Sequence, residues 1–274
     1  MAHTHPSLVF VGGGNMASAI VGGLLRQGRA ASDIGVLEPW AEQRERLASQ
    51  FPGLQLWAES QPAMASAQTV VWAVKPQVMQ EAATACAPYV RHALQLSVAA
   101  GITTASLGAW LGTDRLVRAM PNTPALVGLG TTGLFATAGA DDADRTTADG
   151  LLRSTGDVVW VQQEADLDAV TALSGSGPAY VFYFLEAMRD AGAAMGLAPD
   201  TALRLAVGTF VGAATLAQRS DDPPQVLRER VTSKGGTTYA ALTTMDRLQV
   251  SAHFQQALEA ARARAAELGR EFGG

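Results

Sequence analysis

Three consecutive glycines near the start of the chain have the spacing of a dinucleotide-binding turn. The apolar run 8–11 predicts a buried strand, and the 3.6-residue apolar spacing over 15–25 predicts a helix directly after the glycines. In the pattern Gly12-x-Gly14-x-x-Ala17, the first glycine permits a sharp turn, the second lets a pyrophosphate approach the backbone, and the alanine allows close packing of helix on strand. The helix N-terminus would offer N–H groups and a positive dipole end to phosphate. Glycines also serve ordinary turns, so this stretch alone leaves a purely structural role open.

An acidic residue follows the next predicted strand. Residues 34–37 form a short apolar run that ends at Glu38, about 20 residues beyond the glycine turn, where dinucleotide-binding folds place the acid that binds the adenosine ribose. A solvated strand end is the alternative interpretation. If Glu38 binds the ribose, its carboxylate repels a 2′-phosphate and favours NAD(H), and Arg44 and Arg46 would partly offset that repulsion.

A second group of candidate site residues follows another buried strand. Residues 69–74 are a continuous apolar run, typical of a strand covered on both faces, and Pro76 ends the run by removing a ladder donor. Ligands bind at the carboxyl ends of the strands in such sheets, so we expect residues 73–76 to line the cofactor cleft. Lys75 and Lys234 are the only lysines of the chain, and both lie at the ends of motifs, which favours a site role for each.

The order of predicted elements indicates an α/β fold followed by an all-α part. Further strand-like runs alternate with helices at residues 94–99, 115–119, 132–136 and 157–161. This alternation predicts a parallel sheet with helices on both faces. We expect an N-terminal Rossmann-type NAD(P)-binding domain over residues 1–162 and an all-α dimerisation and substrate-binding domain over residues 163–274.

The helical half is unusually apolar. Residues 166–195 form one helical stretch that is interrupted at 174–178, where Pro178 predicts either a kink or a junction of two helices. Hydrophobic residues make up 48% of the chain and charged residues only 16%, so much apolar surface must be buried. We therefore expect the chain to dimerise through its helices.

Composition narrows the class of protein and its partners. A net charge of −5 argues against a nucleic-acid partner, which would require a basic face. Cys86 is the only cysteine, so no intrachain disulfide is expected and a cytoplasmic location is favoured. The first residues do not read as a signal peptide, and Arg204 interrupts the most apolar later stretch, so we expect no membrane span. The four histidines show no metal-ligand spacing, and no metal is expected.

Five motifs along the chain resemble those of the pyrroline-5-carboxylate reductase family. They are Gly12-Gly-Gly-Asn-Met-Ala17, Ala73-Val-Lys-Pro76, Arg118-Ala-Met-Pro-Asn-Thr-Pro124, Leu173-Ser-Gly-Ser-Gly-Pro-Ala-Tyr180 and Val231-Thr-Ser-Lys-Gly-Gly-Thr-Thr238. The last two together are the most specific. The resemblance implies reduction of L-1-pyrroline-5-carboxylate to L-proline with a reduced nicotinamide cofactor, NADP(H) by default. It also implies a homodimer, often assembled further into a decamer.

The resemblance also implies roles for individual residues. The family's catalytic threonine falls on Thr238, whose hydroxyl would bond the ring nitrogen, and the backbone N–H groups of Gly235, Gly236 and Thr237 would hold the substrate carboxylate. A threonine hydroxyl is a poor acid, so its role is to orient and polarise. The alternative is a helix start capped by threonine. The expected substrate-binding residues are Ser233, Lys234, Gly235, Gly236, Thr237 and Thr238; the expected cofactor-binding residues are Gly12, Gly13, Gly14, Asn15, Met16, Ala17, Glu38, Ser60, Ala73, Val74, Lys75, Pro76, Ala99 and Ala100.

Departures from the family pattern keep alternatives open. Lys234 stands where the family usually has proline, Arg230 and Ser60 stand where some members have asparagine, and Glu38 replaces a small polar residue, which makes NAD(H) a possible cofactor. Lys234 leaves open the reduction of another cyclic imine. A β-hydroxyacid dehydrogenase would need a lysine early in the helical domain, and this chain has none there. A non-catalytic nucleotide-binding paralogue is the third alternative, against which the presence of Thr238 argues.

Overall fold

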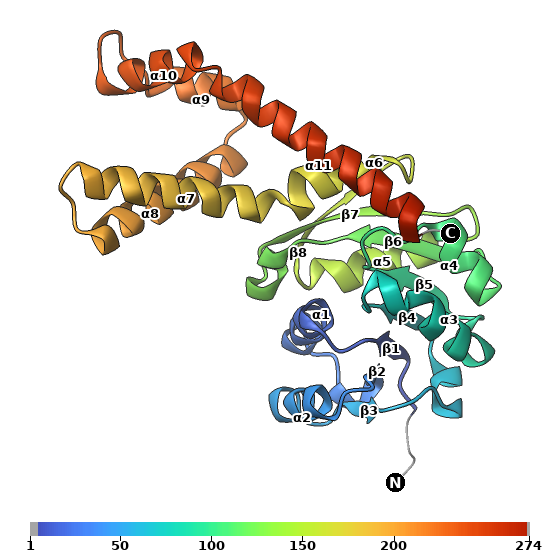
Figure 1. Ribbon diagram of the computed structural model, residues 1–274. Coiled ribbons are helices and arrows are strands. Elements are labelled where there is room, and N and C mark those ends of the chain that lie inside the picture. Colours follow the sequence, from blue (N-terminus) through green and yellow to red (C-terminus); the bar gives the residue numbers. More distant parts are fainter. Residues whose placement is uncertain (1–4, 273–274) are drawn as a thin grey trace. The chain divides into compact units, whose positions relative to one another are not determined.

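The computed structural model describes residues 5–272 and divides by contact into two units. The first unit comprises Met1–Ser176 and Ala261–Gly274, and the second comprises Gly177–Ala260 (Figure 1). Among the described residues, no helix is long and apolar enough to cross a membrane.

An eight-stranded sheet forms the centre of the first unit. Its strands are β1 (Leu8–Val11), β2 (Ile34–Leu37), β3 (Gln55–Trp57), β4 (Thr69–Trp72), β5 (Leu94–Ser97), β6 (Leu116–Met120), β7 (Gly130–Ala136) and β8 (Gly156–Trp160). They lie in the order β3-β2-β1-β4-β5-β6-β7-β8. The chain moves outward from β1 to β3 and then returns to place β4 on the other side of β1. The strand order therefore reverses between β1 and β4, which is where open α/β sheets bind their ligands.

One strand pair departs from the predicted parallel sheet. All neighbouring strands pair in parallel except β6 and β7, which are antiparallel, with Arg118 opposite Phe135. A parallel crossover requires a dozen or more residues, usually with a helix. The connection here contains only a short 3₁₀ turn, η3 (Thr123–Val127), so the chain reverses direction.

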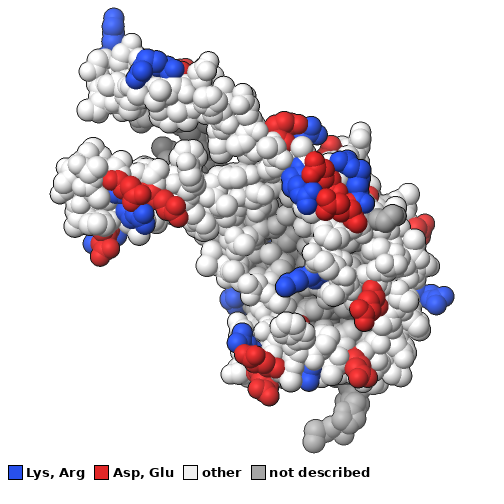
Figure 2. Space-filling view, viewed as in Figure 1, with Lys and Arg blue, Asp and Glu red and all other residues white. Residues whose placement is uncertain are grey.

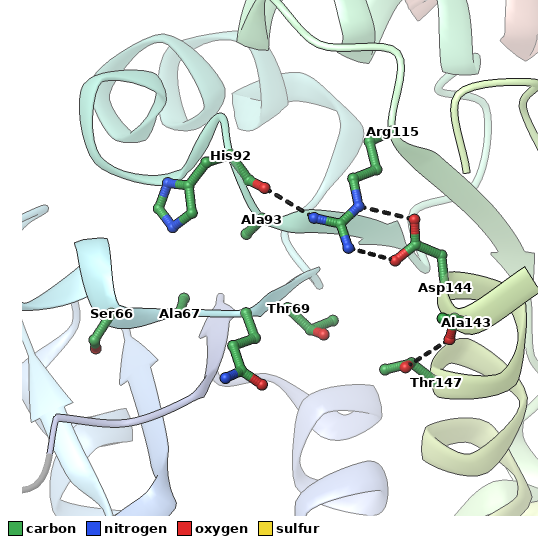
Figure 3. A pocket seen from close by; sticks show the side chains of 10 residues that line it. Ser66, Ala67, Thr69, His92, Ala93, Arg115, Ala143, Asp144 and Thr147 are labelled. Carbon is green, nitrogen blue, oxygen red and sulfur yellow. Dashed lines mark hydrogen bonds and ion pairs between the residues drawn. The ribbon is translucent and has the colours of Figure 1, made fainter. Parts of the chain in front are cut away.

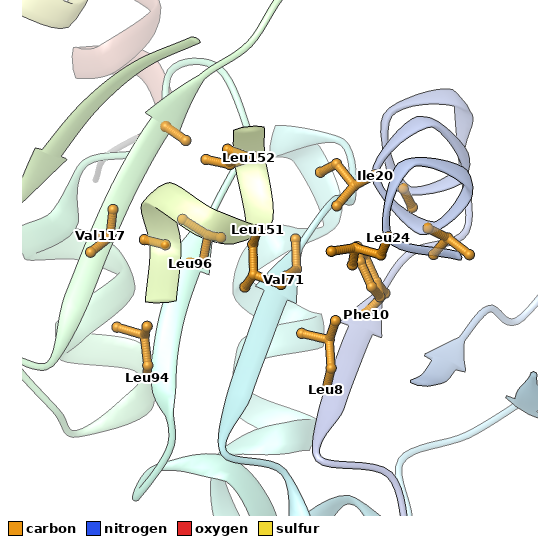
Figure 4. Close-up of a cluster of buried hydrophobic side chains, with 14 of the residues drawn as sticks. Leu8, Phe10, Ile20, Leu24, Val71, Leu94, Leu96, Val117, Leu151 and Leu152 are labelled. Atoms are coloured by element: carbon orange, nitrogen blue, oxygen red, sulfur yellow. The ribbon is translucent and has the colours of Figure 1, made fainter. Parts of the chain in front are cut away.

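Helices cover both faces of the sheet. They are α1 (Asn15–Arg26), α2 (Ala41–Gln50) and α5 (Asp142–Arg153) on one face, and α3 (Pro76–Val90) and α4 (Thr104–Leu111) on the other. Alternate residues of β1 contribute to the two cores: Leu8 and Phe10 pack with α1 and α5 (Figure 4), whereas Val9 and Val11 pack with α3 and α4. This double coverage accounts for the continuous apolar runs in the sequence.

The interrupted helical stretch consists of three pieces. A short helix α6 (Asp166–Val170) continues into a π-helical turn, η4 (Thr171–Gly175), after which α7 (Gly177–Ala194) begins. Pro178 lies in the first turn of α7, where a proline breaks no hydrogen bond of the helix. The junction of two helices, rather than a kink within one helix, is therefore the correct alternative.

The second unit is entirely helical. It contains α7, α8 (Pro199–Arg219), α9 (Pro224–Arg230), α10 (Thr237–Arg247) and the first part of α11 (Val250–Phe272). Helices α7 and α8 pack closely at Gly192, where an added Cβ would lie 2.6 Å from the Cβ of Ala202. From Ala261 onward α11 belongs to the first unit, and Leu268 lies against Gly101.

Large apolar side chains are exposed on the helices of the second unit. Phe182 and Tyr183 of α7 are 59% and 69% exposed, and Leu205 and Val211 of α8 are 57% and 62% exposed. Most of the surface in the space-filling view is uncharged, and the charged side chains that are visible mix both signs (Figure 2). Apolar exposure of this extent is typical of a surface that another protein covers.

Candidate functional site

The glycine turn at the end of β1 fits a pyrophosphate group. Gly12 has φ +97°, and a Cβ there would lie 2.7 Å from the carbonyl oxygen of Ala73. A Cβ on Gly13 would lie 2.5 Å from Cδ1 of Leu47, whereas a Cβ on Gly14 would meet no atom within 4 Å. Gly14 is exposed and is the N-cap of α1, with no side-chain capping bond. The first turn of α1 therefore presents N–H groups and the positive dipole end to an open space.

Both carboxylate oxygens of Glu38 accept backbone hydrogen bonds, and one of them joins Glu38 to this turn. The backbone N–H of Gly13 donates to Oε2 (2.9 Å), and that of Trp40 donates to Oε1 (3.0 Å). The amide of Gln43 in turn donates to the carbonyl of Gly13 (2.6 Å). A carboxylate has about four acceptor positions, so Glu38 keeps capacity for the hydroxyls of a ribose. These two bonds are compatible with both interpretations, and the ribose role of Glu38 stays a prediction.

The other expected cofactor residues of the first unit follow the carboxyl ends of neighbouring strands. Ala73, Val74 and Lys75 come directly after β4, and Lys75 is exposed as the N-cap of α3, with Pro76 at its first position. Ala99 and Ala100 follow β5. Asn15, Met16 and Ala17 open α1, and Ser60 lies three residues beyond β3. The fold thus gathers these residues along one sheet edge; their roles in binding stay predictions.

The expected substrate residues lie in the second unit, where they form the turn that enters α10. Gly235 has φ +75°, and Gly236 is the N-cap of α10 with no side-chain capping bond. Thr237 and Thr238 are the first two helical residues, so neither caps the helix as the alternative interpretation supposed. The N–H of Gly236 already donates to the carbonyl of Ser233 (3.0 Å). The turn itself thus uses one of the three N–H groups expected to hold the carboxylate.

Two of the family motifs are joined by hydrogen bonds that the sequence did not predict. The side-chain amide of Asn122, in the turn after β6, donates to the hydroxyl (3.1 Å) and the carbonyl (3.3 Å) of Ser174 in the π-helical turn. Its carbonyl oxygen accepts from the N–H of Thr131 (2.9 Å). A Cβ on Gly175 would lie 2.5 Å from Cε of Met120. The two motifs were visible in the sequence, but residues about fifty positions apart gave no signal of this contact.

A partly buried ion pair joins β6 to the segment that follows the sheet. Nη1 of Arg118 donates to Oε1 of Glu164 (2.8 Å), and the side chains are 9% and 23% exposed. Glu164 also accepts from the backbone N–H (2.8 Å) and the hydroxyl (2.6 Å) of Thr104, at the start of α4. One carboxylate thus joins β6, α4 and the segment that leads into α6.

Replacing Glu164 with alanine is expected to lower the free energy of unfolding by about 3 kcal/mol, because Arg118 would keep a buried charge without its partner. Urea unfolding followed by circular dichroism would measure the change. The control is E42A, which removes an exposed pair with Arg46 and is expected to leave stability unchanged within error. Equal effects of the two substitutions would contradict the structural role of Glu164.

A hollow of about 340 Å³ lies at the opposite, amino-terminal edge of the sheet (Figure 3). Arg115 lines it and donates to both carboxylate oxygens of Asp144 (2.7 and 2.8 Å) and to the carbonyl of His92 (3.0 Å). The hydrogen bond to Asp144 raises the pKa of Arg115 above its usual value. Because the guanidinium is already paired with the carboxylate of Asp144, this hollow is not a candidate anion site.

The remaining reactive groups do not form a second centre. Cys86 is fully buried, and burial raises the pKa of its thiol to about 12, so it is protonated and inert at neutral pH. Within residues 5–272, no three His, Cys, Asp or Glu side chains are grouped so that they could hold a metal ion.

The sheet with its switch point and the glycine turn at the end of β1 define a protein of the Rossmann class, whose sheets bind dinucleotides at this place. The family description "NADP oxidoreductase coenzyme F420-dependent" matches residues 7–101, and "Pyrroline-5-carboxylate reductase dimerisation" matches residues 164–268. The chain is 46% identical to a pyrroline-5-carboxylate reductase of Pseudomonas aeruginosa over 98% of both chains. It belongs to the pyrroline-5-carboxylate reductase family.

Further relatives and solved structures agree with this assignment. A pyrroline-5-carboxylate reductase of Arabidopsis thaliana is 35% identical over 94% of both chains. The structure of a Coxiella burnetii pyrroline-5-carboxylate reductase has a TM-score of 0.90 at 36% identity and covers 97% of this chain and 99% of its own. The Plasmodium falciparum pyrroline carboxylate reductase, solved with NADP bound, has a TM-score of 0.84 at 27% identity and covers 96% and 98%. The enzyme class expected from the sequence, an NAD(P)H-dependent oxidoreductase acting on a CH–NH group, is confirmed.

Proposed function

We propose that this chain reduces L-1-pyrroline-5-carboxylate to L-proline with NADPH or NADH, the last step of proline biosynthesis. The main structural support for the proposal is the turn at Gly235 and Gly236, which leads into α10 without a side-chain cap. The chain belongs to a family of pyrroline-5-carboxylate reductases. The N–H groups at the start of a helix bind anions, so this turn suits a small substrate that carries a carboxylate.

The first unit holds the cofactor in this proposal. When bound, the reduced nicotinamide supplies the hydride that the imine carbon receives. The N–H groups at the start of α1 bind the pyrophosphate, and Gly14 leaves room for it because no atom lies within 4 Å of an added Cβ. Glu38 accepts hydrogen bonds from the adenosine ribose. Residues 73–76, Ser60, Ala99 and Ala100 line the same edge of the sheet.

The second unit binds the substrate. The N–H groups of Gly235 and Thr237 hold the carboxylate. The carbonyl of Ser233 stabilises the turn by accepting from Gly236, and the exposed Lys234 adds a positive charge beside the carboxylate. The hydroxyl of Thr238 donates to or accepts from the ring nitrogen and orients the imine. Because a threonine hydroxyl does not release its proton readily, most of the rate acceleration comes from alignment of the reacting groups.

Self-association completes the proposal. The matched dimerisation region and the exposed apolar side chains of α7 and α8 support a homodimer that forms through the helical part. We further propose that dimers assemble into a decamer, that the enzyme acts in the cytoplasm, and that the functional domains comprise residues 1–162 and 163–274.

The direct test is the oxidation of NADPH and, separately, of NADH by the purified protein with pyrroline-5-carboxylate, monitored by absorbance. Turnover that depends on the imine supports the proposal. A protein that binds the cofactors but does not turn over this imine would instead support the alternative of another cyclic imine, with the exposed Lys234 as the reason.

Replacing Glu38 with glutamine is expected to raise the ratio of kcat/KM with NADPH to kcat/KM with NADH by roughly tenfold, equivalent to about 1.4 kcal/mol. Glutamine has one amide oxygen, so it keeps an acceptor for the N–H of only one of Gly13 and Trp40, but it removes the charge that repels a 2′-phosphate. Nη1 of Arg44 donates to the carbonyl of Glu38 (2.8 Å), so a positive charge stays in place near the phosphate.

The matched control is E81Q, which removes an exposed carboxylate from α3, on the other face of the sheet from Arg44 and Arg46, and is expected to leave the cofactor ratio unchanged. The variant E38S serves as a second test and should shift the ratio in the same direction as E38Q. If neither substitution at position 38 changes the ratio, Glu38 does not contact the ribose.

A further inference from the structure

Trp40 is the one tryptophan, among the five that the structure describes, whose side chain does not pack against a core. Trp72 is buried and donates to Gln95, and Trp160 donates to Asp149. Trp57 packs over Gly35, where an added Cβ would lie 2.7 Å from its Cζ3. The fifth, Trp110, packs against the core. The side chain of Trp40, in contrast, is 76% exposed and is not part of either core cluster.

The backbone of Trp40 is nevertheless held firmly. Its N–H donates to Oε1 of Glu38, whose Oε2 accepts from the N–H of Gly13, so Trp40 is linked to the glycine turn through one carboxylate. On the other side, Nη1 of Arg44 donates to the carbonyls of Glu38 (2.8 Å) and Pro39 (2.6 Å). Trp40 is also the N-cap of α2. A large exposed side chain thus belongs to a hydrogen-bonded segment beside the carboxyl end of β2.

We propose that the indole of Trp40 forms one wall of the adenine subsite and stacks on the adenine ring of the cofactor. The proposal rests on the proposed function, in which Glu38 binds the adenosine ribose. The adenine extends from that same ribose, and Trp40 lies two residues beyond Glu38 at the same strand end. In the proposed arrangement the base leaves the ribose close to this residue.

The chemistry suits a base more than another occupant. An indole presents a broad apolar face, and stacking of a base on an aromatic side chain needs no hydrogen-bond partner. Because the backbone on both sides is already fixed by Glu38 and Arg44, little conformational freedom of the main chain is lost when the base binds. The same subsite would accept any adenine nucleotide that reaches Glu38 with its ribose.

The test compares ligands with and without adenine. Isothermal titration calorimetry would give Kd values for NADH, ADP-ribose and reduced nicotinamide mononucleotide, which lacks the adenosine half. We expect W40A to weaken NADH and ADP-ribose by about tenfold, within the roughly 5- to 150-fold that loss of one base stack produces. The mononucleotide should bind equally well to W40A and to the wild type. W40F keeps an aromatic face and should restore most of the affinity.

The control variant is V159A, which truncates an exposed apolar residue on β8, at the other end of the strand order, and should leave all three Kd values unchanged. A second readout is tryptophan emission: ADP-ribose should quench the wild type, and W40F should lose most of that quenching. If NADH binds and turns over normally while W40A keeps the wild-type Kd, the stacking proposal is wrong and the proposed function stands. If the wild type binds neither NADH nor NADPH, both are wrong.

Discussion

Replacing Thr238 with valine is expected to lower kcat/KM for pyrroline-5-carboxylate by roughly 100-fold, equivalent to about 2.7 kcal/mol. Valine has nearly the shape of threonine but no hydroxyl, so it removes the proposed hydrogen bond to the ring nitrogen. Thr238 is the second residue of α10, where its hydroxyl does not cap the helix. The loss therefore reports on the chemistry of the site rather than on the start of the helix.

Two further variants separate this effect from a structural one. T238S restores a hydroxyl at the same position and should recover most of the activity. T243V makes the same substitution at an exposed threonine later in α10 and should leave kcat/KM unchanged. Steady-state kinetics and thermal unfolding of all three variants provide the comparison. If T238V keeps wild-type kcat/KM, the assignment of Thr238 fails.

The layered part of the fold could be predicted from the sequence because its signals are local. Apolar runs of four to six residues predicted β1, β2, β4 and β5, and each begins where the pattern placed it. The predicted ends were less accurate: β4 stops at Trp72, although Ala73 and Val74 are also apolar. Those two residues continue past the sheet and lie along its edge beside Gly12. Both residues are only partly buried, so an apolar run marks the strand but does not fix where it ends.

The direction of β7 could not be predicted in the same way. Alternating strands and helices suggested a parallel sheet throughout, but residues between β6 and β7 form only the short turn η3. A strand's own side chains indicate which faces are covered and carry no information about its direction. The length of the connection was the available signal, since a parallel crossover does not fit in it.

In the candidate site, too, local features could be predicted from the sequence and contacts between distant residues could not. Glycines, prolines and Glu38 could be identified because their spacing along the chain carries the information. Two contacts could not be identified in this way, because they join residues that are distant in sequence. They are the hydrogen bonds between Asn122 and Ser174 and the ion pair between Arg118 and Glu164. The same holds for Trp40, whose exposure becomes informative only when the other tryptophans are seen to be packed.

The glycine turn gives the second large expected effect, because its two outer glycines are needed for different reasons. G12A is expected to lower the free energy of unfolding by about 3 kcal/mol, since it combines an overpacked contact with an unfavourable positive φ. The added Cβ would lie 2.7 Å from the carbonyl oxygen of Ala73 and 2.8 Å from Cγ1 of Val74. Because the contact with Ala73 is with backbone atoms, rotation of a side chain cannot relieve it.

G14A is the matched variant with the opposite expected result. Gly14 has φ −73°, and its added Cβ meets no atom within 4 Å, so stability should stay within about 1 kcal/mol of the wild type. The methyl group would instead enter the space proposed for the pyrophosphate, and the Kd for NADPH should rise by at least about tenfold.

Urea unfolding and calorimetric titration with NADPH, measured on both variants, separate the two roles. A stable G14A protein that no longer binds NADPH would assign Gly14 to the cofactor and Gly12 to the fold. If G14A binds NADPH as tightly as the wild type, the pyrophosphate does not approach the backbone at this turn, and the N-terminus of α1 loses its assigned role.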